Sequence, residues 1–327
     1  MNKRIDKFLY NKYFNNKISR EKIQNYIKKG FILLNNKKIK KNKKIKKNDK
    51  IKIFKKKIKI KKNKNKIYKN KNIKVKIHYE DKNLIIINKM PGLVVHPGYG
   101  NYNNTLINWL KYYLKKKKVN DKLSYSHYKM GLLHRLDKNT SGLLLIAKNI
   151  KSYKYLKKQF INKQIKKKYL ALIWGIPSKK KNIIKNNIGR NPKNRIKMIV
   201  INKNNKLIKY SKYSITKYRI LKSYKIISLI KCSIKTGRTH QIRVHFKHLG
   251  HPIFNDNLYG GNKILFNKYK KEIQDLFKIL PRQALHAYYL KYKDPNNKKY
   301  KEVKIKLPKD IKNSLEFLKN NFKTTIY

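Results

Sequence analysis

The spacing of apolar residues predicts a small helical unit at the start of the chain. Positions 5–13 repeat at helical spacing, and a second helix is expected between an N-cap at Ser19 and a stop at Gly30. Two short apolar runs at 31–34 and 51–54 then predict strands, with an Asn-Asn turn after the first. The pattern is that of two helices followed by a basic hairpin.

From Ile77 onward the pattern changes to many short strands with few helices. Strands are expected at 84–89, on both sides of a polar turn after Gly131, at 168–175, and, after a basic loop at 189–192, in several segments between 213 and 234. Helices are expected at 105–114, at 151–162 and in a short segment ending at Leu249. Because strands and helices do not alternate regularly, we expect an α+β domain with a mixed, largely antiparallel sheet and flanking helices.

Composition separates these two parts of the 327-residue chain. Residues 55–76 are dominated by lysine and asparagine with scattered isoleucine, which is typical of a solvated, partly extended linker. We therefore divide the chain into a small unit at 3–54, a linker at 55–76 and a larger domain at 77–327.

The charge of the chain is extreme, with 89 Lys and Arg against 14 Asp and Glu and a formal net charge of +75. Such a field attracts nucleic acid, and the binding weakens as the salt concentration rises. Lys, Asn, Ile and Tyr also have A/T-rich codons, so a biased genome explains much of the magnitude. We take the sign of the charge, and not its size, as an indication of an RNA partner.

Cysteine content and hydropathy indicate the compartment. Cys232 is the only cysteine, so no intrachain disulfide can form and a reducing environment is expected. No window reaches the roughly 18 apolar residues that a bilayer-spanning helix needs. The N-terminus lacks the apolar core of a secretory signal. We expect a cytoplasmic monomer without a membrane partner.

One carboxylate stands out because acidic residues are scarce. Asp137 lies in the polar stretch 134–142, His-Arg-Leu-Asp-Lys-Asn-Thr-Ser-Gly, directly before an apolar run at 143–147. A carboxylate beside Arg135 in a turn that leads into a buried strand suits catalysis. It equally suits an Asx-turn that organises the loop. This stretch alone leaves both interpretations open.

Arginine is rare in this chain: only nine of its 89 basic residues are Arg, and the others are Lys. A guanidinium offers a planar set of donors that matches carboxylate or phosphate in pairs, which an ammonium does not. Arg135, Arg238 and Arg243 lie in polar segments bounded by apolar strands, which favours a functional site there. Codon usage is the alternative explanation for some of the nine.

Several motifs together resemble the RluA family of pseudouridine synthases, in particular its S4-bearing members that act on large-subunit ribosomal RNA. The motifs lie at 134–142, 168–175, 236–245, 250–253, 258–261 and 283–287. The N-terminal unit resembles the S4 RNA-binding domain through Ser19-Arg20, Ile23-Gln24, Gly30 and Leu34-Asn35. Asn36 stands where that domain usually has Gly, and Asn255 stands where Gly is common before Asp256. Asparagine tolerates the left-handed conformation that the turn at Asn36 requires.

The resemblance implies an isomerase that detaches uracil from C1′ of a uridine and rejoins it through carbon, with no metal and no redox cofactor. It assigns catalysis to Asp137, which attacks C1′ or acts as a base at the ribose; the sequence leaves the two open. In either role Asp137 must be ionised, which the guanidinium of Arg243 is expected to favour. Tyr169 is expected to stack on the flipped uracil, and Arg135 to fill the place that the base leaves.

Further residues are expected to contact RNA, the implied partner being large-subunit rRNA or a precursor of the large ribosomal subunit. In the larger domain these are Lys235 and Arg238, which bind phosphate or hold the loop. In the S4-like unit they are Arg4 and Arg20.

Two other function classes are open. A non-catalytic RNA-binding or ribosome-assembly factor on the same fold would bind RNA without turnover. The histidines at 240, 245, 248 and 251 suggest a zinc hydrolase as a further alternative. Imidazoles without a supporting carboxylate or thiolate cluster are, however, a weak indication of a metal site. If 244–245 form a strand, His240 and His245 face opposite sides. We favour hydrogen-bonded structural histidines, His134 included, and no metal.

Overall fold

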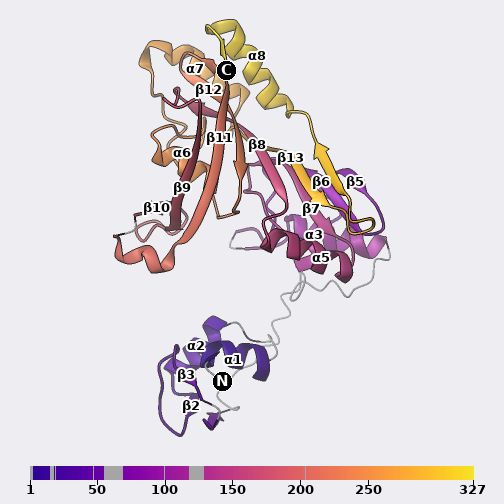
Figure 1. Ribbon diagram of the computed structural model, residues 1–327, viewed down its shortest axis with the longest axis vertical. Helices are drawn as coiled ribbons and strands as arrows, with labels where there is room; N and C mark the ends of the chain where they lie inside the picture. The colour runs from indigo at the N-terminus through magenta and orange to yellow at the C-terminus, as the bar shows by residue number, and fades with distance from the viewer. Residues whose placement is uncertain are drawn as a thin grey trace. The chain divides into compact units, whose positions relative to one another are not determined.

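The computed structural model describes residues 3–14, 18, 20–46, 48–54, 69–98, 100–117, 129–202 and 204–327. The chain divides into two compact units, Met1–Lys66 and Ile67–Tyr327, which Figure 1 labels by element. The N-cap predicted at Ser19 and most of the predicted linker lie outside the described residues. No helix in the described ranges has the length and apolar character needed to cross a bilayer.

The N-terminal unit contains the two helices and the strand pair predicted from its spacing. Its elements are β1 (Lys3–Arg4), α1 (Ile5–Phe8), the π-helical turn η1 (Leu9–Tyr13), α2 (Arg20–Lys28), β2 (Ile32–Leu34), β3 (Lys44–Ile45) and β4 (Ile51–Ile53). Strands β2 and β4 pair antiparallel, as do β1 and β3, a short pair that the sequence did not indicate. Ile5, Leu9, Ile23, Ile27 and Ile32 form a fully buried core.

Residues in the left-handed conformation follow α2 and form the tight turn after β2. Gly30 follows α2 with a φ of 71°, a conformation that a Cβ would strain. Asn35 and Asn36 take φ values of 50° and 58°, so Asn36 adopts the conformation that Gly usually supplies there. The hairpin turn therefore forms despite the substitution.

The larger unit is built on one sheet. Its strands are β5 (Lys76–Glu80), β6 (Leu84–Lys89), β7 (Ser141–Ala147), β8 (Lys166–Trp174), β9 (Lys181–Arg190), β10 (Met198–Ile201), β11 (Lys212–Tyr224), β12 (Ile227–Ile234), β13 (Leu285–Lys293), β14 (Tyr300–Lys304) and β15 (Thr325–Ile326). Over the described residues they form an 11-stranded sheet in the order β10-β9-β11-β12-β8-β13-β7-β6-β5, with β14 on β13 and β15 on β11 (Figure 1). The pairs are antiparallel except for β7 with β13, which confirms the predicted mixed sheet.

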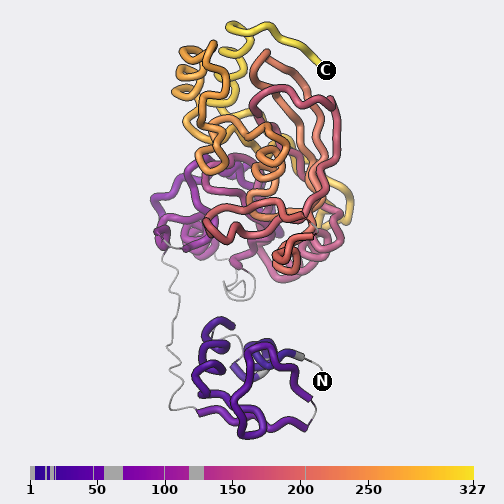
Figure 2. Tube along the Cα trace, turned by 90° about the vertical axis from the view of Figure 1, so that its left-hand side faces the viewer, coloured from indigo at the N-terminus to yellow at the C-terminus, as the bar shows by residue number. Residues whose placement is uncertain are grey.

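Helices cover both faces of this sheet. They are α3 (Leu106–Lys116), η3 (Lys129–Gly131), α5 (Ile150–Ile161), η4 (Lys206–Tyr210), α6 (Gln241–His248), η5 (Asn267–Tyr269), α7 (Lys270–Ile279) and α8 (Lys309–Asn321). Ile85 and Ile87 of β6 pack in one cluster with α3, whereas Leu84 and Ile86 pack on the other face with Tyr153 of α5. Successive side chains of a strand point to opposite faces, so the unbroken apolar run of β6 reflects helices on both sides. Near the C-terminus α7 packs against α8, the orange and yellow coils of Figure 2.

Two local structures predicted from the sequence were wrong, one after Gly131 and one at 244–245. A strand was expected directly after Gly131, but η3 and an irregular loop precede β7; the apolar residues Leu132 and Leu136 are buried from that loop. A strand was considered for 244–245, but these residues belong to α6. Ile242 and Phe246 are buried one helical turn apart, which is the spacing of a helix face.

The basic loop expected at 189–192 is correct in its second half only, because Gly189 and Arg190 end strand β9 and the loop begins at Asn191. Strand β9 pairs antiparallel with β10 on one side and β11 on the other. Most of its side chains are at least partly exposed, so its Lys and Asn residues hid the alternation that identifies a half-buried strand.

Candidate active site

Asp137 lies in the irregular loop that leads into β7, and its side chain is 17% exposed. The N–H of Thr140 donates to the backbone oxygen of Asp137 at 3.1 Å, which closes a turn directly before the strand. His134 accepts the N–H of Leu145 at its Nε2 (3.0 Å), so this histidine ties the loop to β7. Within the described residues no loop N–H donates to the Asp137 carboxylate, so the Asx-turn interpretation finds no support.

Arg243 of α6 lies between two carboxylates. Its Nη1 donates to Oδ2 of Asp137 at 2.9 Å, while Nε and Nη2 donate to Oδ2 and Oδ1 of Asp256 at 2.7 and 2.8 Å. The Asp137–Arg243 ion pair that the resemblance implied is therefore present. The paired bonds to Asp256 fix the plane of the guanidinium, and the remaining donor is directed at Asp137. Burial acts to lower the pKa of Arg243, but the hydrogen bonds and charge of Asp256, with the charge of Asp137, raise it overall.

Asp256 was missed in the sequence, although it holds the arginine. It is fully buried, and its Oδ1 also accepts the backbone N–H groups of Leu258 and Tyr259 at 3.1 and 3.3 Å. The turn around it needs special backbone: Asn255 has a φ of 54°, and a Cβ on Gly261 would come within 1.7 Å of a backbone oxygen. The available signal was the scarcity of acidic residues, which makes a carboxylate between turn-forming residues informative.

Tyr169 projects from β8, a central strand, and is 6% exposed. Burial raises the pKa of its phenol above the usual range, and the nearby charge of Asp137 acts in the same direction. The phenol is therefore a neutral hydrogen-bond donor at physiological pH.

Asp137, Tyr169 and Arg243 line one cavity of about 520 Å³. The predicted RNA-contacting residues Arg135, Lys235 and Arg238 line the same cavity, and Arg135 and Lys235 are exposed there. Arg238 donates from Nε to the backbone oxygen of Tyr213 at 3.1 Å. Of the described residues that line the cavity, Asp137 is the one carboxylate, so an ionised oxygen faces a basic wall that suits an anionic ligand.

The other two predicted RNA-contacting arginines belong to the N-terminal unit. Arg4 and Arg20 both bind the buried Asp6, with Nη2 to Oδ2 distances of 3.1 and 2.8 Å. Each keeps 39% of its side chain exposed, so donors are held in place at the surface of that unit. Their contact with RNA stays a prediction.

Of the four histidines around α6, His240, His245 and His251 form hydrogen bonds within the protein, as expected, whereas His248 is exposed and no hydrogen bond to its side chain occurs among the described residues. His245 is bonded at Nε2 to Ser214 Oγ and at Nδ1 to Thr216 Oγ1, both at 2.9 Å, and His251 Nδ1 is bonded to the backbone oxygen of Trp174 at 2.9 Å. Burial lowers the pKa of His245 to about 4, so it is neutral at physiological pH. The argument about opposite faces of a strand does not apply, because His245 lies in a helix.

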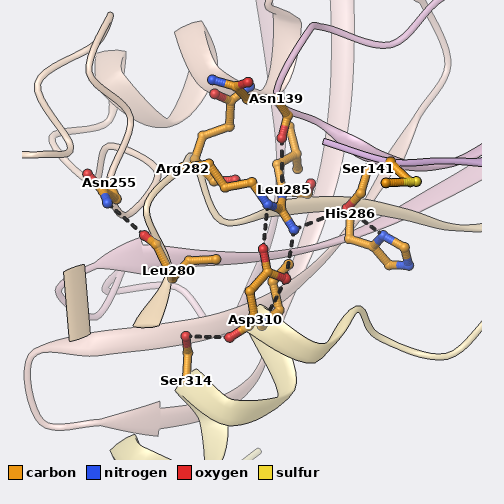
Figure 3. A network of polar contacts seen from close by, with 12 residues as sticks. Asn139, Ser141, Asn255, Leu280, Arg282, Leu285, His286, Asp310 and Ser314 are labelled. Atoms are coloured by element: carbon orange, nitrogen blue, oxygen red, sulfur yellow. Dashed lines mark hydrogen bonds and ion pairs between the residues drawn. The ribbon is translucent and has the colours of Figure 1, made fainter. Parts of the chain in front are cut away.

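Arg282 holds the loop that follows Asp137 and was not assigned a role from the sequence. Its Nη1 donates to the backbone oxygen of Asn139 at 3.0 Å and its Nη2 to Ser141 Oγ at 3.3 Å (Figure 3). Asp310 at the start of α8 accepts from Nε and Nη2 at 2.6 and 3.0 Å. The C-terminal helix is thus connected to the catalytic-motif loop through one buried guanidinium. The rarity of arginine was the signal that could have found it.

Lys89 holds the same loop from β6 and was likewise missed. Its ammonium is 1% exposed and donates to the backbone oxygens of Met90, Leu93 and Lys138 at 2.8, 3.0 and 2.8 Å. Burial lowers the pKa of Lys89 to about 7, against the raising effect of the Asp137 charge. In an 80-lysine chain nothing in the sequence distinguished this residue.

Replacing Arg282 by Lys is expected to destabilise the protein by about 1–3 kcal/mol, because one ammonium cannot satisfy the oxygens that the guanidinium binds. The rate of the isomerisation that the resemblance implies should fall as well, since the loop after Asp137 loses two hydrogen-bond donors. Urea unfolding and initial rates measure both effects. Arg219→Lys, at an exposed position on β11, is the matched control. Equal behaviour of the two variants would show that Arg282 does not hold the loop.

Comparison with known proteins identifies the family of the chain. The family model for RNA pseudouridylate synthases matches residues 83–248, and the S4 domain model matches residues 3–51. A protein of Chlorobaculum parvum named an uncharacterized RNA pseudouridine synthase is 36% identical over 316 residues, covering 96% of this chain and 93% of the relative. Ribosomal large subunit pseudouridine synthase D of Buchnera aphidicola subsp. Schizaphis graminum is 40% identical over 244 residues, covering 74% of this chain and 72% of that protein.

A solved structure shows the same likeness in three dimensions. Human RNA pseudouridylate synthase domain containing 4 aligns with a TM-score of 0.58 at 25% identity, covering 75% of this chain and 93% of that one. The family model and the relatives together cover both units of the chain. The chain therefore belongs to the RNA pseudouridylate synthase family, isomerases that act on RNA, and carries an N-terminal S4 domain.

Proposed function

We propose that this chain converts uridine to pseudouridine in large-subunit ribosomal RNA and that Asp137 is its catalytic carboxylate. The observation that carries the proposal is the Asp137–Arg243 pair in a basic cavity that Tyr169 also lines. Arg243 engages Oδ2, and no hydrogen bond to Oδ1 is present among the described residues. One charged oxygen is therefore available to a ribose. The choice of RNA follows relatives named as large-subunit synthases.

The reaction needs no added redox partner, because it is an isomerisation within one uridine. The bond from C1′ to N1 breaks and a bond from C1′ to C5 forms, while C5 loses its proton and N1 gains one. As the glycosidic bond opens, Asp137 either attacks C1′, in a bond that breaks again when C5 bonds to C1′, or removes a proton from the ribose and returns it. Tyr169, a neutral phenol, stacks on the uracil. Because a paired uridine is hidden, the base flips into the cavity at a cost of roughly a few kcal/mol, and Arg135 fills the vacated place. Lys235 and Arg238 bind the phosphates beside it.

The domain boundaries are part of the proposal. The S4 domain at 3–54 docks on RNA through Arg4 and Arg20, a linker at 55–76 connects it, and the domain at 77–327 carries out the reaction. We propose that the chain works as a monomer, since its proposed catalytic residues all come from one chain. A ribosomal RNA substrate also favours the cytoplasm as its place of action.

The test is conversion of uridine by the purified full-length chain on large-subunit rRNA, with small-subunit rRNA and tRNA as comparison substrates. Mapping pseudouridines in rRNA from cells with and without the gene identifies the positions. We expect a small set of large-subunit uridines to convert in vitro and to lose the modification in the deletion strain. Binding of rRNA without any conversion would contradict the proposal and favour a non-catalytic factor.

Binding of rRNA is expected to weaken by about 10³-fold or more between roughly 50 and 200 mM salt, because lysine and arginine contacts release counterions from the phosphates. The change from Lys235 to Ala should reduce the slope of log K against log salt by about one, with little effect on which uridine converts. A filter-binding titration at several salt concentrations measures both. A flat response would contradict a phosphate-dominated interface.

A further inference from the structure

His240 stands one turn before Arg243, at the N-terminus of α6, and lines the same cavity as Asp137. Its φ of 54° and ψ of 20° lie in the left-handed region, which is strained for a residue with a Cβ unless its surroundings hold it there. Its side chain makes no capping bond to the helix. The left-handed backbone of His240 therefore places the imidazole in the cavity, and its side chain does not cap the helix.

The hydrogen bonds of Tyr259 favour the tautomer of His240 that carries its hydrogen on Nε2. The backbone N–H of Met198 can only donate, and it donates to the Tyr259 hydroxyl at 2.9 Å. The same hydroxyl lies 2.8 Å from His240 Nδ1, and no other acceptor for its hydrogen occurs among the described residues. Donation from Tyr259 to Nδ1 makes Nδ1 an acceptor, so a neutral His240 carries its hydrogen on Nε2.

The neutral form of His240 is favoured by its surroundings. Burial lowers the pKa of the imidazole, and the charges of Arg243 and Arg135 act in the same direction. The charges of Asp137 and Asp256 oppose this shift without reversing it.

Tyr259 is itself held by the groups that hold Arg243. The guanidinium of Arg243 lies 5.0 Å from the centre of the Tyr259 ring, and the backbone N–H of Tyr259 donates to Asp256. The ring is 6% exposed. A change in the tyrosine position would therefore disturb the arginine, so the orientation of His240 is coupled to the ion pair.

The Nε2–H of His240 faces Asp137 in this arrangement. Nε2 lies 3.9 Å from Oδ2 of Asp137, the same oxygen that Arg243 binds at 2.9 Å. Hydrogen bonds of an active site commonly tighten once substrate is bound. We propose that His240 is a positioning residue for Asp137: its Nε2–H, set by Tyr259, acts with Arg243 on Oδ2 and leaves Oδ1 directed at the ribose. This inference rests on the proposed catalytic role of Asp137.

Two conservative variants separate the two nitrogens. His240→Asn places an amide near Nδ1 and removes the donor toward Asp137, whereas His240→Gln places its amide near Nε2. We expect the single-turnover rate to fall about tenfold in His240→Asn and less in His240→Gln, because a hydrogen bond to a charged oxygen is lost only in the first. The Kd for rRNA should stay within about twofold in both, as expected for an interaction that strengthens in the transition state.

His248→Gln is the matched control, since His248 is exposed on the same helix. It should keep the full rate. A rate for His240→Asn equal to that of the unaltered chain would overturn the inference, and so would equal losses of rate and RNA affinity.

The tautomer is measured without turnover, by NMR of full-length protein labelled with ¹⁵N-histidine and assigned by comparison with His240→Gln. We expect a neutral ring with the hydrogen on Nε2. A hydrogen on Nδ1, or a doubly protonated ring at neutral pH, would overturn the inference. If the unaltered chain converts no uridine, the proposed function fails and takes this inference with it. If it converts uridine and His240→Asn is as fast, only the inference fails.

Discussion

Asp137→Asn is expected to abolish conversion of uridine while rRNA binding persists. The amide keeps the shape of the carboxylate and still offers an oxygen to Arg243, but it carries no charge and cannot attack C1′ or take a proton. Loss of a group that acts on the reacting atom typically costs at least roughly 10⁴-fold in rate. Single-turnover conversion on large-subunit rRNA measures the loss.

The same variant should bind RNA at least as tightly as the unaltered chain, because it removes a negative charge from a cavity with basic walls. It should also fold, since Arg243 keeps its paired bonds to Asp256. Asp275→Asn is the control, at a half-exposed carboxylate on α7 that pairs with Lys278. Conversion by Asp137→Asn at a rate near that of the control would sink the catalytic assignment.

Much of the fold could be predicted because the central strands carry strong local signals. In β6 and β7 nearly every side chain is buried, so their apolar runs identify them without further information. Likewise α5 begins at a residue with a capping side chain, Asn149, and shows helical periodicity over its length. The apolar runs of the two strands and the helical spacing of α5 are both visible in the sequence itself.

Elements that depend on distant partners could not be predicted. Strand β9 is polar along much of its length and is a strand because β10 and β11 pair with both of its edges. The loop before β7 carries apolar residues that resemble a strand, yet within that segment only Leu132 forms a β-bridge, to Ile146. Its later part is held by hydrogen bonds from Lys89 and Arg282 to backbone oxygens. No periodicity in the sequence reports hydrogen bonds of this kind.

The residues of the site likewise divide into those that the sequence indicated and those that only the folded structure revealed. Asp137 and Arg243 are 106 residues apart, and only the resemblance to a known family paired them, whereas the rarity of acids and arginines had drawn attention to each residue separately. The second carboxylate on Arg243 was missed, because the scarcity of acidic residues was the signal available at Asp256 and the sequence does not show that its side chain is buried. Burial is a property of the folded chain, and it turns Asp256 from a turn residue into the group that orients the arginine.

Asp256→Asn is therefore expected to cost about 1–3 kcal/mol of unfolding free energy, because it leaves the buried guanidinium of Arg243 with one charged partner in place of two. Conversion per folded molecule should also fall, since the plane that directs Nη1 at Asp137 is no longer fixed by paired charged bonds. Urea unfolding and single-turnover rates, measured well below the unfolding transition, separate the two effects.

The matched comparison is Asp294→Asn, at another fully buried carboxylate, which binds Lys301 at 2.6 Å and does not line the cavity. Both variants remove the charge of a fully buried carboxylate that binds a cation, so both should lower the free energy of unfolding. The Asp294 pair is the less buried of the two, because Lys301 keeps 38% of its side chain exposed. Only Asp256→Asn should slow conversion by the folded protein, because only its partner also binds Asp137. Equal rates for the two variants would mean that Asp256 stabilises the fold without orienting the arginine, and the geometry of Asp137 would then depend on Arg243 and its own loop alone.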